Sequence, residues 1–209
     1  AKGTSSRSTK LVHGGVRYLR QGNVSLVLDA LRERGLLLKN APHLVHNLSF
    51  IIPAYRWPDA LLYGLGLKVY DRLAGSLSFG SSQCLSPEET IQRLPTLNPS
   101  HLVGGIAYHD GQFDDARLAI NLAQTATKFG AAVANYVGCI DLIKQDGQVV
   151  GIRAQDSETR DVFDIPAKTV INATGVFVDA LRQIDNPNES SIVSPSQGVH
   201  LVLPRKFLP

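Results

Sequence analysis

Apolar residues recur at helical spacing in five stretches of the chain, and most of these stretches carry a recognisable start or stop signal. The expected helices cover residues 24–40, 57–73, 86–94, 115–129 and 177–184. Pro42 follows the first helix, and Pro58 lies in the first turn of the second. Ser86 and Glu89 form the pattern of a capping box. Asp114 is placed to cap the fourth helix, which is expected to end at Gly130.

Shorter β-rich runs lie between these helices. A three-stranded antiparallel meander is expected over residues 138–145, 148–155 and 160–165. Its first turn is Asp146-Gly147, a dipeptide that strongly favours a two-residue hairpin. Further strands are expected at residues 48–52, 105–109, 131–136, 169–172 and 198–203, of which 131–136 and 169–172 would be buried. The mixture predicts an α/β fold (α+β overall).

Composition limits the class of protein. The 209 residues are 44% hydrophobic and 19% charged, with 18 Gly and 11 Pro, which excludes a disordered, collagen-like or coiled-coil chain. Cys84 and Cys139 are isolated, so neither a zinc ribbon nor a disulfide scaffold is indicated. His43 and His46 are more typical of loop and surface positions than of a metal site, and we expect no metal. The most apolar helix, 57–73, contains four charged residues and is not expected to span a membrane.

The charge is unevenly distributed. The net charge is +3, yet residues 1–28 contain five basic residues and no acidic one. The segment Thr4–Lys10 adds hydroxyl groups and backbone N–H groups, which together suit an anionic ligand. A solvated basic tail is the alternative. The sequence contains neither a Walker-type phosphate loop nor a strand followed by G-x-G-x-x-G.

The run Val170–Gly175 predicts a strand that ends in small residues. Ligands in open α/β sheets bind outside the carboxyl ends of the strands, so this turn is a candidate contact. A tight strand-to-helix turn would explain Gly175 equally well without a ligand.

Five ordered segments resemble FAD-dependent glycerol-3-phosphate dehydrogenases, within the D-amino-acid-oxidase-like superfamily. They are Gly3–Leu19, Asp29–Leu44, Phe113–Leu118, Val170–Gly175 and Gln197–Pro204. That family opens with a strand and a glycine-rich turn that hold the ADP half of FAD, and it continues beyond the last segment. The chain is therefore expected to be an internal piece of such an enzyme.

The resemblance implies a role for each matched residue. The residues implied to bind FAD are Thr4, Ser5, Ser6, Ser8, Lys10, Leu11, His13, Gly14, Gly15, Ala173, Thr174 and Gly175. Arg17 and Tyr18 would face the substrate, and His200 would point at its reacting carbon. His200 and Arg17 are the implied catalytic residues. In some relatives the histidine that corresponds to His13 carries a covalent flavin link.

These residue types suit the implied reaction. Oxidation of a secondary alcohol needs a proton acceptor, for which a histidine of near-neutral pKa is the usual choice. An arginine offers a permanently charged, bidentate partner for phosphate or a developing oxyanion. The alternatives are that His200 is a core residue on a strand and that Arg17 is a surface ion-pair residue.

The implied fold is a partial FAD-binding, Rossmann-like domain interleaved with a β-rich substrate domain. The FAD domain would comprise residues 1–41 and 110–190, and the substrate domain residues 42–109 and 191–209. The implied activity is oxidation of sn-glycerol 3-phosphate to dihydroxyacetone phosphate, with electrons passed to quinone or oxygen. A homodimer and a membrane-surface contact are further expectations. The expected location is cytoplasmic, peripheral on the inner face of the cytoplasmic membrane.

Two other functional interpretations remain open. The piece could fold but be inert, because the segment that holds the ADP half of FAD is not in the sequence. It could instead be a non-enzymatic anion- or nucleic-acid-binding domain. Stacking of bases would require aromatic residues among the cations, and residues 1–28 contain only Tyr18, so we expect no nucleic acid.

Overall fold

The computed structural model describes residues 3–16, 18 and 21–207 and divides the chain into two compact units. Unit 1 comprises residues 1–130 with 204–209, and unit 2 comprises residues 131–203. Each unit is described by itself. Within the described residues, no helix has both the length and the apolar character needed to cross a bilayer.

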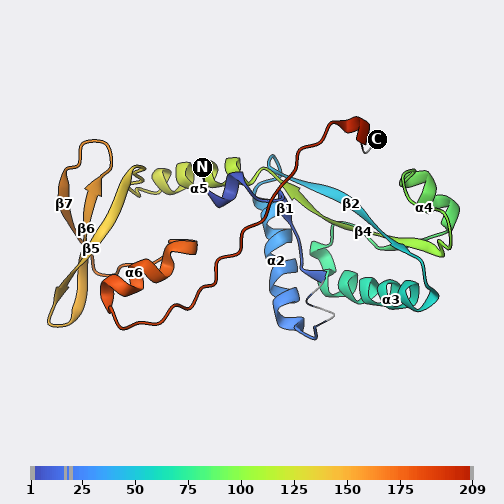
Figure 1. The fold of residues 1–209 in the computed structure, drawn as a ribbon, viewed down its shortest axis with the longest axis horizontal. Coiled ribbons are helices and arrows are strands. Elements are labelled where there is room, and N and C mark those ends of the chain that lie inside the picture. The colour runs from blue at the N-terminus through green and yellow to red at the C-terminus, as the bar shows by residue number, and fades with distance from the viewer. Residues whose placement is uncertain (1–2, 17, 19–20, 208–209) are drawn as a thin grey trace. The chain divides into compact units, whose positions relative to one another are not determined.

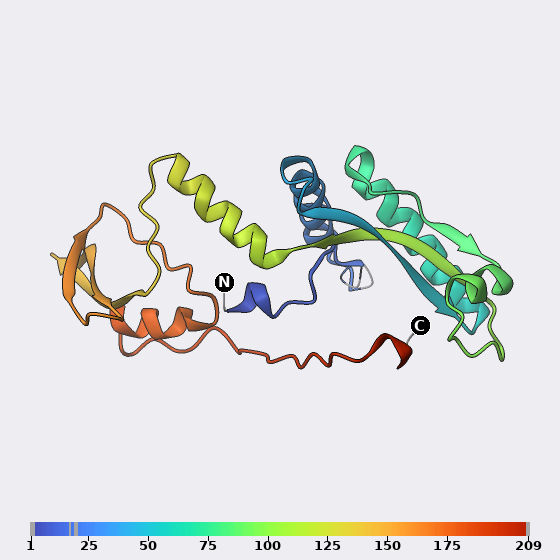
Figure 2. The ribbon, with the colours of Figure 1, turned by 90° about the horizontal axis from the view of Figure 1, so that it is seen from above.

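Unit 1 is built on a four-stranded antiparallel sheet whose central strand is β4 (Gly104–Phe113). β2 (Val45–Ala54) pairs with β4 along its whole length, from Val45 opposite Phe113 to Ala54 opposite Gly104. On the other side of β4 lie β1 (Leu11–Val12) and β3 (Gln83–Leu85), at opposite ends of the strand. Figure 2 shows that β2 and β4 twist strongly along their length.

Two helices cover one face of this sheet. α2 (Val24–Asn40) and α3 (Trp57–Ala74) lie on the same side of the β2–β4 pair (Figure 1). The main core is formed by apolar residues of both helices and both strands: Val27, Leu31, Ala54, Leu67, Tyr70, Ala74 and Ile106. Residues 106, 108 and 110 share one face of β4 because side chains alternate along a strand. The face that carries Ile106 therefore continues toward Asp110.

The remaining elements of unit 1 are short or exposed. They are the 3₁₀ turns η1 (Thr4–Ser6), η2 (Gly75–Leu77) and η4 (Arg205–Phe207), with the helices α4 (Pro87–Arg93) and α5 (Asp115–Lys128). The expected caps are confirmed. Ser86 and Glu89 form a reciprocal capping box, and the Asp114 carboxylate accepts from the N–H of Arg117.

Unit 2 is an antiparallel meander followed by a helix. Its strands are β5 (Val137–Gln145), β6 (Gln148–Asp156) and β7 (Val162–Pro166), in that order across the sheet. The β5–β6 turn has positive φ at Asp146 (52°) and Gly147 (76°), as a type I′ hairpin requires. After η3 (Gly175–Phe177), helix α6 (Val178–Asp185) is tied to the chain that follows, because Asp179 accepts the N–H groups of Ile192 and Val193.

The mixed α/β class, the five helices and the meander are confirmed, but three expected strands are wrong. Residues 131–136, 169–172 and 198–203 form no strand. The expected burial of 131–136 and 169–172 is wrong too, because most of their residues are exposed. None of the three pairs with another strand in the described part of the chain, so their backbone groups have no ladder to join. The expected domain boundaries are not tested by this division and stay a prediction.

Candidate functional site

The β1 strand and the loop after it border a cavity of about 230 Å³ in unit 1. Residues from three strands and the loop surround this cavity: Leu11, His13, Gly15, Val16, Tyr18, Phe50, Tyr108 and Asp110. Leu11, His13, Gly15 and Tyr18 come from the segment that the sequence analysis selected. Phe50, Tyr108 and Asp110 come from β2 and β4. The fold therefore brings part of the expected site together and adds a wall that was not foreseen.

An aromatic pair forms that wall. Phe50 and Tyr108 are opposite each other in the β2–β4 register, and their rings stack with centroids 5.4 Å apart. Burial, followed by the nearby charge of Asp110, raises the pKa of the Tyr108 phenol. The wall therefore consists of two stacked aromatic rings, one of which carries an uncharged phenol.

The two loop glycines have different structural causes. A Cβ at Gly14 would collide with Leu31 and with the Tyr70 hydroxyl, so close packing alone requires glycine there. Gly15 has φ +69°, a conformation that glycine adopts without strain, and it lines the cavity. Beside them, the Nδ1 atom of His13 accepts a hydrogen bond from the Gly15 N–H at 3.1 Å. In the neutral imidazole, the proton must then be on Nε2.

A buried polar network lies directly behind this loop. Arg34 from α2 and Asp110 from β4 form an ion pair, with Nη1 and Oδ1 2.6 Å apart and side chains 1% and 4% exposed. Tyr70 from α3 donates to Asp110 Oδ2 at 3.2 Å. The Gly14 N–H lies 3.0 Å from the Tyr70 hydroxyl and 3.2 Å from Asp110 Oδ1. The backbone of the expected site is thus bonded to the core of the unit.

Arg34 is held by its surroundings on several sides. Its Nη1 also donates to the His109 carbonyl at 3.3 Å. The guanidinium carbon lies 4.5 Å from the ring centre of Phe79 and 5.6 Å from that of Tyr70. Its Nε is buried without a hydrogen-bond partner in the described part of the chain. Arg34 is therefore a cation whose position is set by the Asp110 carboxylate and by two aromatic faces.

The hydroxyl-rich N-terminal segment is a short turn closed by its own side chains. Thr4–Ser6 forms η1, and Lys10 Nζ donates to the Ser5 carbonyl at 2.7 Å. Ser8 Oγ accepts from the Lys10 N–H at 3.3 Å. These contacts place the backbone of the segment, and the side chains of Thr4 and Ser6 are largely exposed. Arg17, the expected substrate arginine, is outside the described residues.

The other expected residues belong to unit 2. The Asn172 amide oxygen accepts from both the N–H and the hydroxyl of Thr174, and Gly175 has φ +60°. This geometry accounts for the glycine as a turn residue, while Ala173, Thr174 and Gly175 are exposed. His200 is exposed in an extended segment, so its interpretation as a core strand histidine is wrong. Its role as proton acceptor stays a prediction.

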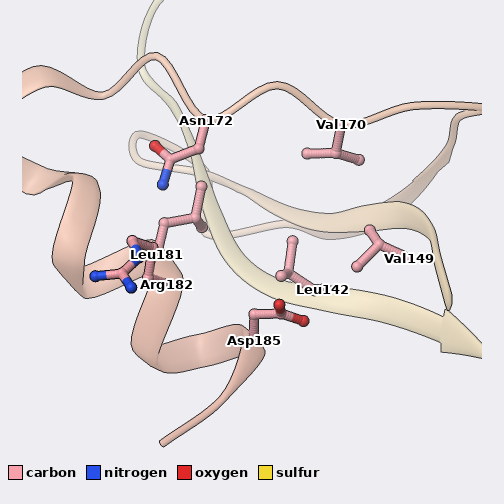
Figure 3. A pocket seen from close by; sticks show the side chains of 7 residues that line it. All are labelled: Leu142, Val149, Val170, Asn172, Leu181, Arg182 and Asp185. Carbon is pink, nitrogen blue, oxygen red and sulfur yellow. The ribbon is translucent and has the colours of Figure 1, made fainter. Parts of the chain in front are cut away.

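Unit 2 also contains a cavity of about 170 Å³ between β5, β6 and α6 (Figure 3). Leu142, Val149, Val170 and Leu181 give it an apolar lining. Its two charged residues are already paired with other groups. Arg182 binds Asp179 and Glu189, and Asp185 binds Lys144. This cavity carries no chemistry of its own.

Sequence reasoning missed the three residues of the buried network. Asp110 was detectable in principle, because this carboxylate directly follows the expected strand 105–109, which is mostly apolar. Arg34 and Tyr70 gave no such signal, since charged and aromatic residues are ordinary on amphipathic helices. Only the packing of α2 against α3 shows that these side chains turn inward.

Comparison with known proteins agrees with this geometry. The family model described as FAD dependent oxidoreductase matches residues 1–209. The chain belongs to this family. Similar proteins include the mitochondrial glycerol-3-phosphate dehydrogenases of Macaca fascicularis and Homo sapiens. Each is 44% identical over 222 aligned residues, and each alignment covers 100% of this chain. The resemblance stated from the five segments is confirmed.

A solved structure of a glycerol-3-phosphate dehydrogenase also resembles this chain. The glycerol-3-phosphate dehydrogenase from Bacillus halodurans, crystallised in complex with FAD, is 33% identical with a TM-score of 0.64 over 88% of this chain. The alignment covers 29% of that protein, and the chain spans 30% of the length of the two curated mitochondrial relatives. The L-proline dehydrogenase of P. horikoshii shares the fold, with a TM-score of 0.69 at 14% sequence identity. The match covers 91% of this chain and 48% of that protein.

Proposed function

We propose that this chain supplies flavin-facing and substrate-facing residues of an FAD-dependent dehydrogenase that oxidises sn-glycerol 3-phosphate to dihydroxyacetone phosphate. The observation that carries the proposal is the unit 1 cavity. Five residues of the segment similar to the family's flavin-contacting segment line it together with an aromatic wall: Leu11, His13, Gly15, Val16 and Tyr18. The substrate is proposed from the similarity to mitochondrial glycerol-3-phosphate dehydrogenases, which are 44% identical over 222 aligned residues.

The cavity lining fits a flat, conjugated ring. The stacked Phe50 and Tyr108 rings provide an apolar surface, and Gly15 lines the cavity beside the Tyr18 ring, which packs where a Gly15 side chain would lie. Apolar walls with a few placed polar groups are typical of cofactor sites. We therefore assign the FAD ring to this side of unit 1, against His13 and Gly15.

Bound FAD supplies the acceptor for the hydride that leaves the alcohol carbon. The reaction also needs a group that takes the hydroxyl proton. His13 is poorly suited, because Nδ1 is already used by the Gly15 N–H and Nε2 then carries the proton in the neutral ring. We assign proton acceptance to His200, and binding of the phosphate or the developing oxyanion to Arg17 and Tyr18.

We also propose where the protein is located and which molecule accepts its electrons. The outer face of α3 exposes Trp57, Leu61, Leu62, Leu65 and Val69. An apolar helix face of this kind supports peripheral binding to a membrane surface, where a quinone acceptor would be reached. Oxygen is the alternative acceptor, and a homodimer is the proposed assembly.

The test is steady-state oxidation by the complete, FAD-loaded protein with a dye acceptor. We expect sn-glycerol 3-phosphate to be oxidised with a far higher kcat/KM than glycerol, which lacks the phosphate. Formation of hydrogen peroxide without the dye would identify oxygen as the acceptor. A protein that binds FAD fully but does not oxidise glycerol 3-phosphate would contradict the proposed substrate, and one that binds no FAD would support an inert or merely anion-binding chain.

A further inference from the structure

The Arg34–Asp110–Tyr70 network joins three elements to one backbone amide. Arg34 is on α2, Tyr70 on α3 and Asp110 on β4, and all three residues are at most 3% exposed. Tyr70 and Asp110 both accept a hydrogen bond from the N–H of Gly14, and Arg34 donates to both of these side chains. Burial of an ion pair is costly unless further hydrogen bonds satisfy its atoms, so a network of this kind needs a reason other than simple stability.

The donors and acceptors of the network fit one arrangement. The Tyr70 hydroxyl has one proton, and it donates this to Asp110 Oδ2. Its oxygen accepts from the Gly14 N–H and from Arg34 Nη1, at 3.0 and 3.2 Å. Asp110 Oδ1 accepts from the same two donors. Replacing any one member would therefore disturb the bonds that hold the Gly14 amide.

The protonation of Tyr70 is also fixed. Burial, and then the negative charge of Asp110, raises the pKa of the Tyr70 phenol far above its ordinary value. The phenol remains a hydrogen-bond donor at any pH at which the enzyme would work. The Tyr70 hydroxyl therefore keeps the proton that it donates to Asp110 Oδ2.

Gly14 is held on its inner side only. The two residues next to it, His13 and Gly15, line the cavity. Since a Cβ at Gly14 would meet Leu31 and Tyr70, the loop already packs tightly against the helices and is bonded to them. The position of the Gly14 backbone therefore determines where His13 and Gly15 would contact a ligand.

We infer that Tyr70 and Asp110, with Arg34 as the counter-ion, are positioning residues that fix the His13–Gly15 loop against the flavin ring. This inference rests on the proposed function, because that function places the ring in the cavity. It extends the function by assigning loop geometry to three residues outside the flavin-facing segment. In this role Tyr70 acts through the Gly14 backbone and does not touch the ring.

The test compares two conservative variants of the complete protein. Tyr70→Phe removes one hydroxyl from the network. Tyr63→Phe is the matched control, since Tyr63 is on the same helix, packs against the same core and has no hydrogen bond to the network in the described structure. Hydrogen exchange of residues 11–16 is measured with and without FAD, together with the visible flavin spectrum, the flavin reduction potential, kcat and KM.

For Tyr70→Phe we expect exchange in residues 11–16 at least about tenfold faster than in Tyr63→Phe, with FAD still bound. We also expect an altered flavin spectrum and potential, and kcat lowered about 10-fold to 100-fold with a smaller change in KM, the scale of a misplaced reacting group. If both variants behave alike except in melting temperature, the network is merely structural and the inference is wrong. Should the wild type fail to oxidise glycerol 3-phosphate, the proposed function fails, while exchange and the flavin spectrum still decide the positioning role.

Discussion

Single residues decide how far the site could be foreseen. His13, Gly15 and Tyr18 were selected by their resemblance to a flavin-contacting segment, and the fold places them around one cavity. Asp110 on β4 escaped notice because its importance depends on Arg34 and Tyr70, which lie 76 and 40 positions away in the sequence. Long-range pairing of this kind leaves no periodic signal in a single chain.

The assignment of His200 makes a prediction about the reaction rate. In the complete protein, His200→Ala should lower kcat for glycerol 3-phosphate by roughly 10²–10⁴-fold, because a positioned general base contributes on that scale. Flavin content should stay near normal, since His200 lies outside the loop that we propose to face the flavin. His46→Ala, at an exposed position of β2, is the control. A wild-type kcat with full flavin would refute the catalytic role, and loss of flavin would show a role in cofactor binding.

Tyr70 makes a prediction about alkaline stability. Its pKa is raised in the folded protein, whereas the unfolded chain has a phenol pKa of about 10. Above pH 10 the unfolded chain loses this proton and the folded protein keeps it, so the free energy of unfolding falls as pH rises. The decline is at most about 1.4 kcal/mol per pH unit, and below pH 10 the stability is fully present.

The measurement is the melting temperature of the complete protein between pH 8 and pH 11. Tyr70→Phe should weaken the alkaline decline, and Tyr63→Phe should leave it as in the wild type. An unchanged slope in Tyr70→Phe would mean that the Tyr70 phenol ionises in the folded state as readily as in the unfolded chain.

At the scale of elements, local signals predicted most of the structure. Capping residues and prolines gave the limits of α2, α3 and α5 to within a residue or two, and Asp146-Gly147 gave the hairpin. The three wrong strands had the right composition but no neighbour to pair with. A strand is a property of a sheet, and an apolar run of four to six residues cannot specify its partner.

The α4 capping box provides a prediction at this scale. Ser86 Oγ accepts from the Glu89 N–H at 3.1 Å, and the Glu89 carboxylate accepts from the Ser86 N–H at 2.8 Å. Ser86→Ala removes the first bond and should lower the free energy of unfolding by about 1 kcal/mol. Ser81→Ala, at an exposed position with no cap, is the control. Equal melting temperatures in the two variants would show that the α4 cap contributes nothing to global stability.

At the scale of the whole molecule, apolar surface is the dominant feature of the described chain. Val199, Leu201 and Val202 in the extended segment are 80%, 81% and 96% exposed, and Phe129 after α5 is 88% exposed. Patches of this kind mark contact surfaces or aggregation liabilities. The chain also spans less than a third of the length of its curated mammalian relatives.

These surfaces predict the behaviour of the 209 residues expressed alone. We expect self-association, because exposed apolar side chains are buried when they contact other copies of the chain. Light scattering after size exclusion should show oligomers, with strong binding of a hydrophobic dye. Replacing Val199, Leu201 and Val202 by serine should reduce both signals, whereas three serine substitutions at exposed polar positions of β7 and the 157–161 turn should not. A monomer with one sharp thermal transition would show that the described fold is self-sufficient and that its apolar surface needs no cover.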